Sequence, residues 1–218
     1  MSELIIFDLD NTLIEGDSDR NWGQFLVEEK LVSEDYLLES EKFYNSYYGG
    51  NLDIDSFLSF CLEPLKNNQM DKLIDIRKKF IDTKIKPIIR DKAMRTVLGE
   101  IRKNNKVVIA TATNSFVTRP IAELFSVKEL IATEFEIIDN KFTGKVKGVP
   151  CFREGKLDKV NEWLKSQNYN LSDATFYTDS FNDLPLLERV GKAIVVDGDD
   201  KLILLAKKNG WECVSFRM

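Results

Sequence analysis

The sequence predicts an α/β protein with a doubly wound, mostly parallel sheet and a helical cap inserted after the first strand. Three observations lead to this fold class. A short apolar run opens the chain at residues 1–8, and residues 17–84 then carry helical patterns with no clear strand. From residue 87 onward, β-branched apolar runs alternate with amphipathic helical patterns. Alternation of strands with helices is typical of a parallel sheet that helices cover on both faces.

The elements of the predicted sheet follow from local patterns. Residues 106–110 form a β-branched run that indicates a buried strand, and Asp139-Asn140 indicates the turn of a β-hairpin. Leu157, Val160 and Leu164 recur at helical spacing. We therefore expect strands at 1–8, 106–110, 174–177, 193–196 and 211–216, a hairpin of 134–138 with 142–146, and helices at 93–103, 119–125, 156–166, 184–189 and 201–208.

The segment after the first strand carries its own helix signals. Trp22, Phe25 and Leu26 have the spacing of one apolar helix face, and Gly49-Gly50 ends a helix that begins after Ser33. We expect further helices at 54–61 and 71–83, a core domain of residues 1–15 and 87–218, and a helical cap of residues 16–86, with linkers near Glu15-Gly16 and Lys86-Pro87.

Composition excludes several classes of function. The 218 residues include 31 Lys and Arg and 36 Asp and Glu, giving a net charge of −5 with no basic block, which argues against a nucleic-acid partner. The absence of histidine excludes Ser-His-Asp and Cys-His catalysis and histidine-bound zinc. The three cysteines form no CxxC pair. With no signal peptide or apolar run of membrane length, we expect a cytoplasmic protein without a membrane partner and leave its oligomeric state open.

The most informative stretch contains two aspartates directly after the first apolar run. Asp8 and Asp10 lie two residues apart, and residues i and i+2 of a strand face the same side. We expect both carboxylates to point to one spot near the carboxyl end of the strand. Two carboxylates held close together repel unless a cation or a proton lies between them. Such a pair costs stability, and it indicates a metal-bound nucleophile with an acid/base partner.

Three further polar clusters are expected at the same edge of the sheet, because ligands of doubly wound sheets bind at the carboxyl ends of the strands. Oxygen ligands without nitrogen or sulfur suit Mg²⁺, while a lysine with a hydroxyl suits phosphoryl transfer. Each cluster alone has an ordinary structural explanation, but their common placement favours a site. The four clusters are Asp8, Asp10 and Thr12; Thr111; Lys156; and Asp179 with Asn182 and Asp183.

These clusters resemble the four motifs of the haloacid dehalogenase-like (HAD) phosphatase superfamily over nearly the whole chain. The matching stretches are FDLDNT, VVIATAT, REGK and YTDSFNDLPLL. The helical insertion is similar to the cap of subclass I-B, which includes phosphoserine phosphatase. The resemblance implies a Rossmann-like core and a Mg²⁺-dependent phosphatase that hydrolyses a small organic phosphate through an aspartyl-phosphate intermediate. One departure is Thr178, which stands where the fourth motif usually carries glycine.

The resemblance also implies roles for individual residues. Asp8 would be the nucleophile, and Asp10 would be the general acid and base. Thr111 and Lys156 would bind the phosphate group of the substrate. The Mg²⁺ ligands would be the Asp8 carboxylate, the Asp10 backbone carbonyl and Asp179, supported by Asp183 and Asn182.

Two other activities remain open on the same fold. A phosphotransferase or phosphomutase would pass the phosphate to an organic acceptor in place of water. A non-catalytic phosphate-binding module is expected to lack a catalytic residue, whereas all of them are present. Dehalogenases of the superfamily do not need the second aspartate of the first motif, so Asp10 favours phosphate chemistry.

The cap sequence bears on the substrate. Asp17 falls where related phosphoserine phosphatases carry a glutamate beside the substrate amino group, so it is a candidate substrate-selecting residue. Those enzymes hold the substrate carboxylate with a cap arginine, whereas no arginine occurs between residues 21 and 76 here and Cys61 occupies roughly that place. The stretches TATNSFVTRPIA and DSFNDLPLLE are similar to a bacterial branch that includes histidinol-phosphate phosphatases. Histidinol phosphate and phosphoserine are therefore the two favoured substrates, and the first fits this cap better. Phosphatidylglycerophosphate is a further option, but the lack of a membrane segment or a basic amphipathic helix argues against it.

Overall fold

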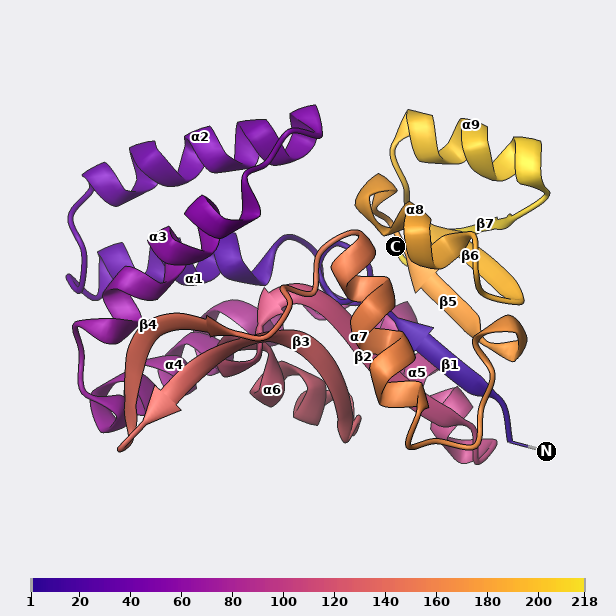
Figure 1. Ribbon diagram of the computed structural model, residues 1–218, viewed down its shortest axis with the longest axis horizontal. Helices are drawn as coiled ribbons and strands as arrows, with labels where there is room; N and C mark the ends of the chain where they lie inside the picture. Colours follow the sequence, from indigo (N-terminus) through magenta and orange to yellow (C-terminus); the bar gives the residue numbers. More distant parts are fainter. Residues whose placement is uncertain (1, 218) are drawn as a thin grey trace.

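A seven-stranded sheet with the order β4-β3-β2-β1-β5-β6-β7 forms the centre of the protein (Figure 1). The computed structural model describes residues 2–217. Neighbouring strands pair in parallel except β3 and β4, which form an antiparallel hairpin. This architecture confirms the predicted fold class. The strands are β1 (Leu4–Phe7), β2 (Lys106–Asn114), β3 (Glu129–Ile138), β4 (Lys141–Lys147), β5 (Thr175–Thr178), β6 (Lys192–Val196) and β7 (Glu212–Val214).

Helices cover both faces of the sheet because its central strands are apolar on both sides. In β1, Ile5 and Phe7 belong to one buried cluster, whereas Leu4 and Ile6 belong to a second. The first cluster includes apolar residues of α5 and α6, and the second includes those of α7, α8 and α9. These helices are α5 (Asp91–Arg102), α6 (Ser115–Leu124), α7 (Glu154–Leu164), α8 (Leu184–Leu187) and α9 (Asp200–Asn209).

The order of the strands reverses at β1. The chain passes from β1 to β2 and β3 on one side and later continues with β5 on the other side of β1. Ile6 of β1 lies opposite Val108 of β2 and Phe176 of β5, so the three strands run in register. Such a reversal opens a crevice at the carboxyl ends of the strands, where doubly wound folds bind their ligands.

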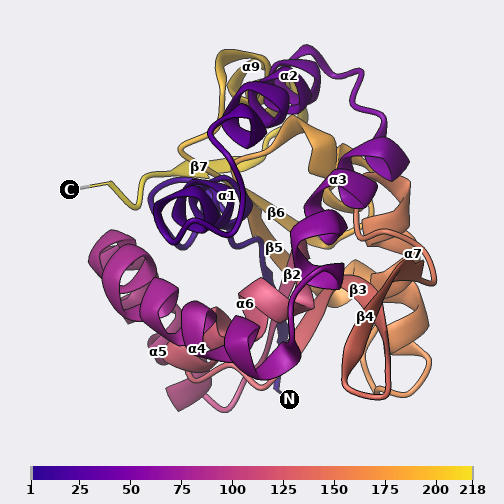
Figure 2. The same cartoon turned by 90° about the vertical axis from the view of Figure 1, so that its left-hand side faces the viewer.

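An all-helical segment follows β1 and lies beyond the carboxyl end of that strand (Figures 1 and 2). The chain enters and leaves it at neighbouring points, because the Glu15 N–H donates to the Ile88 carbonyl at 2.7 Å. Its apolar face packs on the core, with Trp22 at 6.1 Å from the Phe116 ring of α6. The division into core and cap stays a prediction. The segment contains α1 (Ser18–Glu28), α2 (Asp35–Gly49), α3 (Ile54–Lys66), α4 (Met70–Phe80), a π-helical turn (Ile81–Ile85) and a 3₁₀ turn (Lys86–Ile88).

Several element boundaries differ from those predicted, and three of them lie around β2. Strand β2 continues past residue 110 to Asn114, because β-branched threonines extend it and the Thr133 hydroxyl donates to the Ala112 carbonyl at 2.7 Å. Helix α6 begins at Ser115, where Asn114 accepts from the Val117 N–H at 3.1 Å. Strand β3 begins before the predicted hairpin, since its first half pairs in parallel with β2. Between residues 2 and 217, no helix is both long and apolar enough to cross a membrane.

Candidate active site

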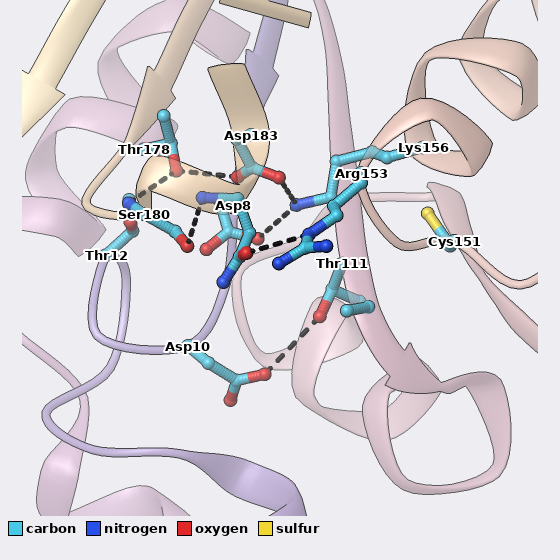
Figure 3. Close-up of polar contacts among 12 residues, drawn as sticks. Asp8, Asp10, Thr12, Thr111, Cys151, Arg153, Lys156, Thr178, Ser180 and Asp183 are labelled. Atoms are coloured by element: carbon cyan, nitrogen blue, oxygen red, sulfur yellow. Dashed lines mark hydrogen bonds and ion pairs between the residues drawn. The ribbon is translucent and has the colours of Figure 1, made fainter. Parts of the chain in front are cut away.

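Lys156 joins two of the predicted clusters at the carboxyl edge of the sheet (Figure 3). Its ammonium group lies 2.9 Å from Asp8 Oδ1 and 2.6 Å from Asp183 Oδ1. Asp8 directly follows β1, and its N–H donates to the Tyr177 carbonyl of β5 at 2.8 Å. Lys156 lies in the first turn of α7 and is 2% exposed. The predicted nucleophile and the predicted phosphate-binding lysine therefore form a buried ion pair.

Burial and nearby charges shift the pKa values of Asp8 and Lys156. Burial raises the pKa of Asp8 well above its usual range; Lys156 opposes this, and Asp183 and Asp179 add to it. Burial lowers the pKa of Lys156, but Asp183 and Asp8 outweigh that effect, and the net pKa is raised well above normal. Lys156 is therefore a fixed positive charge, and the carboxylates of Asp8 and Asp183 share it.

Asp10 lies in a turn after β1, where hydrogen-bond donors hold its carboxylate. The Ser18 N–H donates to Oδ1 at 2.6 Å, the Thr113 hydroxyl to Oδ2 at 2.8 Å, and the Thr111 hydroxyl to Oδ2 at 3.4 Å. Burial raises the pKa of Asp10, and these hydrogen bonds counteract the increase. Because β1 ends at Phe7, the strand periodicity expected for Asp8 and Asp10 does not apply. The turn, and not a shared strand face, brings both residues to one cavity.

Thr12 fixes the aspartate that follows β5. Its hydroxyl donates to Asp179 Oδ1 at 2.8 Å and accepts from the Asp179 N–H at 3.0 Å. Burial raises the pKa of Asp179 to about 7, with Asp183 adding to the increase. Asp179 therefore has a hydroxyl partner, Lys156 partly offsets its charge, and within residues 2–217 it forms no ion pair.

Thr178, the departure from the usual fourth motif, takes part in the site. Its hydroxyl donates to Asp183 Oδ2 at 2.6 Å and accepts from the Ser180 N–H at 3.1 Å. Asp183 consequently accepts from Thr178 on one oxygen and binds Lys156 with the other. A glycine could not supply this hydroxyl, so the substitution adds a fixed contact to the site.

Arg153 connects Asn182, which follows β5, with Gly50 at the end of α2. Its Nε donates to Asn182 Oδ1 at 3.1 Å, and its guanidinium also donates to the Gly50 carbonyl at the end of α2, at 2.6 Å. The backbone of Arg153 has φ +52°, a left-handed value that is strained in a residue other than glycine. A second contact of the same kind joins Tyr47 Oη and Ser180 Oγ at 3.2 Å. We call the Arg153–Gly50 and Tyr47–Ser180 hydrogen bonds the cross-cavity contact.

These groups surround a cavity of about 540 Å³. Its volume lies within the usual range for small-molecule sites. Eight of the predicted site residues line it, and Thr12 lies behind them, bonded to Asp179. The eight are Asp8, Asp10, Asp17, Thr111, Lys156, Asp179, Asn182 and Asp183, and residues of α1, α2 and α3 close the other side of the cavity.

The helical wall of the cavity carries two carboxylates. Asp17 caps α1, because its Oδ1 accepts from the Arg20 N–H at 2.8 Å. Asp19, in the first turn of α1, was not predicted as a site residue; its Oδ2 accepts from the Cys61 thiol at 3.3 Å. Its first-turn position gives an ordinary helix signal, so only the folded contacts single it out. Thr113 and Arg153 were also missed as individual residues, although both belong to the stretches that resemble the family motifs.

The donor set around the strand ends fits a hard cation. Asp8 and Asp179 offer carboxylate oxygens, and burial raises the pKa of both. Among residues 2–217, no group of three or more Cys, Asp or Glu side chains is arranged to hold a metal ion. The predicted ligand set contains two carboxylates and the Asp10 backbone carbonyl, and it stays a prediction. Oxygen donors with incomplete charge compensation suit Mg²⁺.

Known proteins with similar sequences include phosphatases. A histidinol-phosphatase of Neisseria meningitidis serogroup C (strain 8013) is 36% identical over 222 residues, which cover 100% of both chains. A phosphoserine phosphatase of Mycobacterium tuberculosis is 27% identical over 216 residues, or 97% of this chain and 70% of that protein. These relatives confirm the predicted enzyme class, a phosphatase.

The protein also resembles solved structures and matches a family model. A protein of unknown function from Bordetella pertussis Tohama I has a TM-score of 0.91 at 34% identity, covering 100% of both chains. A substrate-bound phosphoserine phosphatase has a TM-score of 0.71 at 20% identity, covering 98% of this chain and 93% of that one, and so shares the fold. The model of the haloacid dehalogenase-like hydrolases matches residues 5–188. The chain belongs to the haloacid dehalogenase-like hydrolase family.

Proposed function

We propose that the protein hydrolyses a small phosphomonoester through a covalent phosphate on Asp8. The observation that carries this proposal is the position of Lys156, which binds Asp8 at 2.9 Å and Asp183 at 2.6 Å beside the cavity. A carboxylate that attacks a phosphate dianion needs fixed positive charge next to it. Lys156 supplies that charge, and the Thr111 hydroxyl, which lines the same cavity, is the proposed donor to a phosphate oxygen.

The proposed reaction has two steps. An Asp8 oxygen attacks phosphorus in line, the bond to the leaving oxygen breaks, and Asp10 gives its proton to that oxygen. Burial raises the pKa of Asp10 and thereby favours the protonated form that this step needs. In the second step, a water oxygen attacks the phosphorus of the aspartyl phosphate while Asp10 takes a proton from the water. Inorganic phosphate leaves, and both carboxyl groups return to their starting states.

Mg²⁺ is the proposed cofactor, in keeping with the general use of this ion by phosphatases of the family. The Asp8 carboxylate, the Asp10 backbone carbonyl and Asp179 would hold the ion, and Asp183 and Asn182 would support it. When bound, the ion would supply positive charge that offsets repulsion between the carboxylates and the substrate phosphate. The raised pKa values of Asp8 and Asp179 support this assignment, because both carboxylates are buried without enough positive charge.

Histidinol phosphate is the proposed substrate, ahead of phosphoserine. It carries an ammonium group and a flat ring but no carboxylate. The helices of residues 16–86, which we propose act as a cap, present Asp17, Asp19 and several aromatic rings to the cavity. The same segment has no arginine from residue 21 to residue 76 to bind a substrate carboxylate. The similarity to a histidinol-phosphatase over the whole chain supports the same choice. A cytoplasmic location also remains a prediction.

The test is phosphate release by the purified protein from histidinol phosphate, phosphoserine and para-nitrophenyl phosphate, each with Mg²⁺ and with EDTA. We expect Mg²⁺-dependent turnover of all three and a kcat/KM for histidinol phosphate at least about tenfold above that for phosphoserine. A clear preference for phosphoserine would contradict the substrate assignment. Absence of turnover above the EDTA background would favour a phosphate-binding module, and transfer to an added alcohol in place of water would favour a phosphotransferase.

A further inference from the structure

Asp19 lies on α1, beside the end of β2, where its Oδ1 accepts from the Asn114 amide. It occupies the first turn of α1 and lines the same cavity as Asp8 and Lys156. Its carboxylate is therefore available to a phosphomonoester bound in that cavity. Neither Mg²⁺ binding nor the two proposed reaction steps use this residue.

The contacts of Asp19 are all with neutral donors. Its Oδ2 accepts from the Cys61 thiol at 3.3 Å and from the Tyr44 hydroxyl at 3.5 Å. Its Oδ1 accepts from the Asn114 amide at 3.4 Å. Charged hydrogen bonds to a carboxylate are normally shorter, at about 2.7–2.9 Å. The side chain is thus held in place without a strong partner.

The basic residue next to Asp19 in the sequence binds another carboxylate. The adjacent Arg20 bonds Glu41 at 2.6 Å, and its guanidinium lies over the Tyr44 ring at 5.3 Å. Across residues 2–217, no lysine or arginine is within ion-pair distance of Asp19. Burial raises the pKa of Asp19 to about 6, and the neighbouring Asp10 adds to the increase. Removing part of the water around a carboxylate costs free energy unless something positive binds to it.

Asp17 is in a different position, although the sequence favours it. One of its oxygens accepts from the Arg20 N–H at 2.8 Å and so serves the helix N-terminus. This bond commits the side chain of Asp17 to α1. Asp19 has no comparable backbone partner, and both of its oxygens have only weak neutral donors.

We propose that Asp19 is the specificity-determining residue that binds the ammonium group of the substrate. This inference rests on the proposed function, because it assumes that the leaving group carries a cation. The ammonium of a bound substrate supplies the positive charge that the wall lacks, while Cys61 and Tyr44 keep the carboxylate in place. The small neutral thiol of Cys61 contributes to this site, because it contacts Asp19 without neutralising its charge.

The test compares histidinol phosphate with its deamino analogue, which keeps the ring and the phosphate but lacks the amino group. The variants are Asp19→Asn, Asp17→Asn, Asp19→Glu and, as a charge-matched control, Asp75→Asn on the exposed face of α4. For each variant, the ratio of kcat/KM for the two substrates is measured. We expect Asp19→Asn to lower this ratio about tenfold, mainly through KM, and Asp19→Glu to retain part of it. The ratio in Asp75→Asn is expected to stay within about twofold of the original value.

A second measurement does not require turnover. Calorimetric binding of histidinol to the EDTA-treated protein should weaken about tenfold in Asp19→Asn and little in Asp75→Asn. Thermal unfolding of every variant shows whether the fold is intact.

The outcomes separate the inference from the proposed function. A ratio that falls in Asp17→Asn but not in Asp19→Asn would overturn the inference and leave the proposed substrate standing. An equal loss on both substrates in Asp19→Asn would also overturn it, because that pattern shows a structural role. A wild-type enzyme that does not distinguish the two substrates would overturn the assigned cation site, and a preference for phosphoserine would overturn the proposed function as well.

Discussion

The strand-end side and the helical side of the cavity both carry carboxylates, but these carboxylates have different partners. At the strand ends, Asp8 and Asp183 share Lys156 at 2.9 Å and 2.6 Å. On the helical side, Asp19 has only neutral donors, at 3.3 to 3.5 Å. Short charged contacts fix a geometry before the substrate arrives, whereas an uncompensated carboxylate leaves room for a charge that the substrate brings. The comparison indicates that chemistry is fixed on one side of the cavity and selectivity on the other.

The largest expected effect lies on the strand-end side. Replacing Asp8 with Asn removes the nucleophilic oxygen but keeps the shape of the side chain and its contact with Lys156. We expect kcat for every phosphomonoester to fall by about 10⁴-fold or more, since loss of a catalytic nucleophile has effects of this size. An endpoint or continuous assay of phosphate release measures kcat. The thermal midpoint of unfolding should change little. Activity within about tenfold of the original would contradict the covalent mechanism.

The second prediction concerns stability on the same side. Lys156→Met leaves Asp8 and Asp183 buried without their shared cation, so the free energy of unfolding should fall by about 3–5 kcal/mol. Lys165→Met is the matched control on the same helix region, because Lys165 forms an exposed pair with Glu162 and its loss should cost about 0–1 kcal/mol. Urea unfolding at pH 7 measures both. Equal losses of unfolding free energy in the two variants would show that the ion pairs of Lys156 contribute no more than an exposed pair does.

The strand-end side could be predicted from the sequence for a physical reason. Asp8 and Asp179 each follow a short apolar strand, and parallel strands end at the same edge of the sheet. The alternation of strands and helices therefore places these groups together without knowledge of any contact. Thr111 was predicted after a strand that in fact continues to Asn114, yet the residue still lies at the cavity, because threonine is compatible with either position.

The helical side could be predicted much less well. Its contacts join residues far apart in the sequence, such as Cys61 with Asp19 and Arg153 with Gly50, and no local pattern encodes them. The spacing of apolar residues indicates that helices form, but it does not fix which polar side chain of a helix faces a cavity. Asp17 and Asp19 lie two residues apart on α1, and only the fold shows that the first caps the helix while the second has no strong partner.

The third prediction tests the cross-cavity contact, which joins the strand-end side to the helical side. Arg153→Ala removes the bonds to Asn182 and Gly50, so the helical side should close less well over the substrate. We expect kcat/KM for histidinol phosphate to fall by about tenfold, as for loss of a charged hydrogen bond. Arg153→Gly removes the same bonds but relieves the left-handed backbone at φ +52°, so it should be more stable than the alanine variant by about 0.5–1 kcal/mol. Similar activity losses in both variants, with different thermal midpoints, would separate the contact from the strain.

The smallest expected effect concerns the pH dependence of stability on the helical side. Burial raises the pKa of Asp19 to about 6, above that of an exposed aspartate in the unfolded chain, with Cys61, Tyr44 and Asp10 as the titratable groups facing it. Between these two values the folded state binds more protons than the unfolded state, so the contribution of Asp19 to stability decreases as pH rises from about 4 to 6 and then levels off. As pH rises over this interval, the unfolding free energy of Asp19→Asn should therefore increase relative to that of the wild type. The expected increase is about 1 kcal/mol after allowance for solvent screening. Urea titrations at several pH values on either side of 6 measure the shift. A difference that stays constant with pH would mean that the carboxylate is already neutralised in the free protein, and the contrast between the two sides of the cavity would not hold.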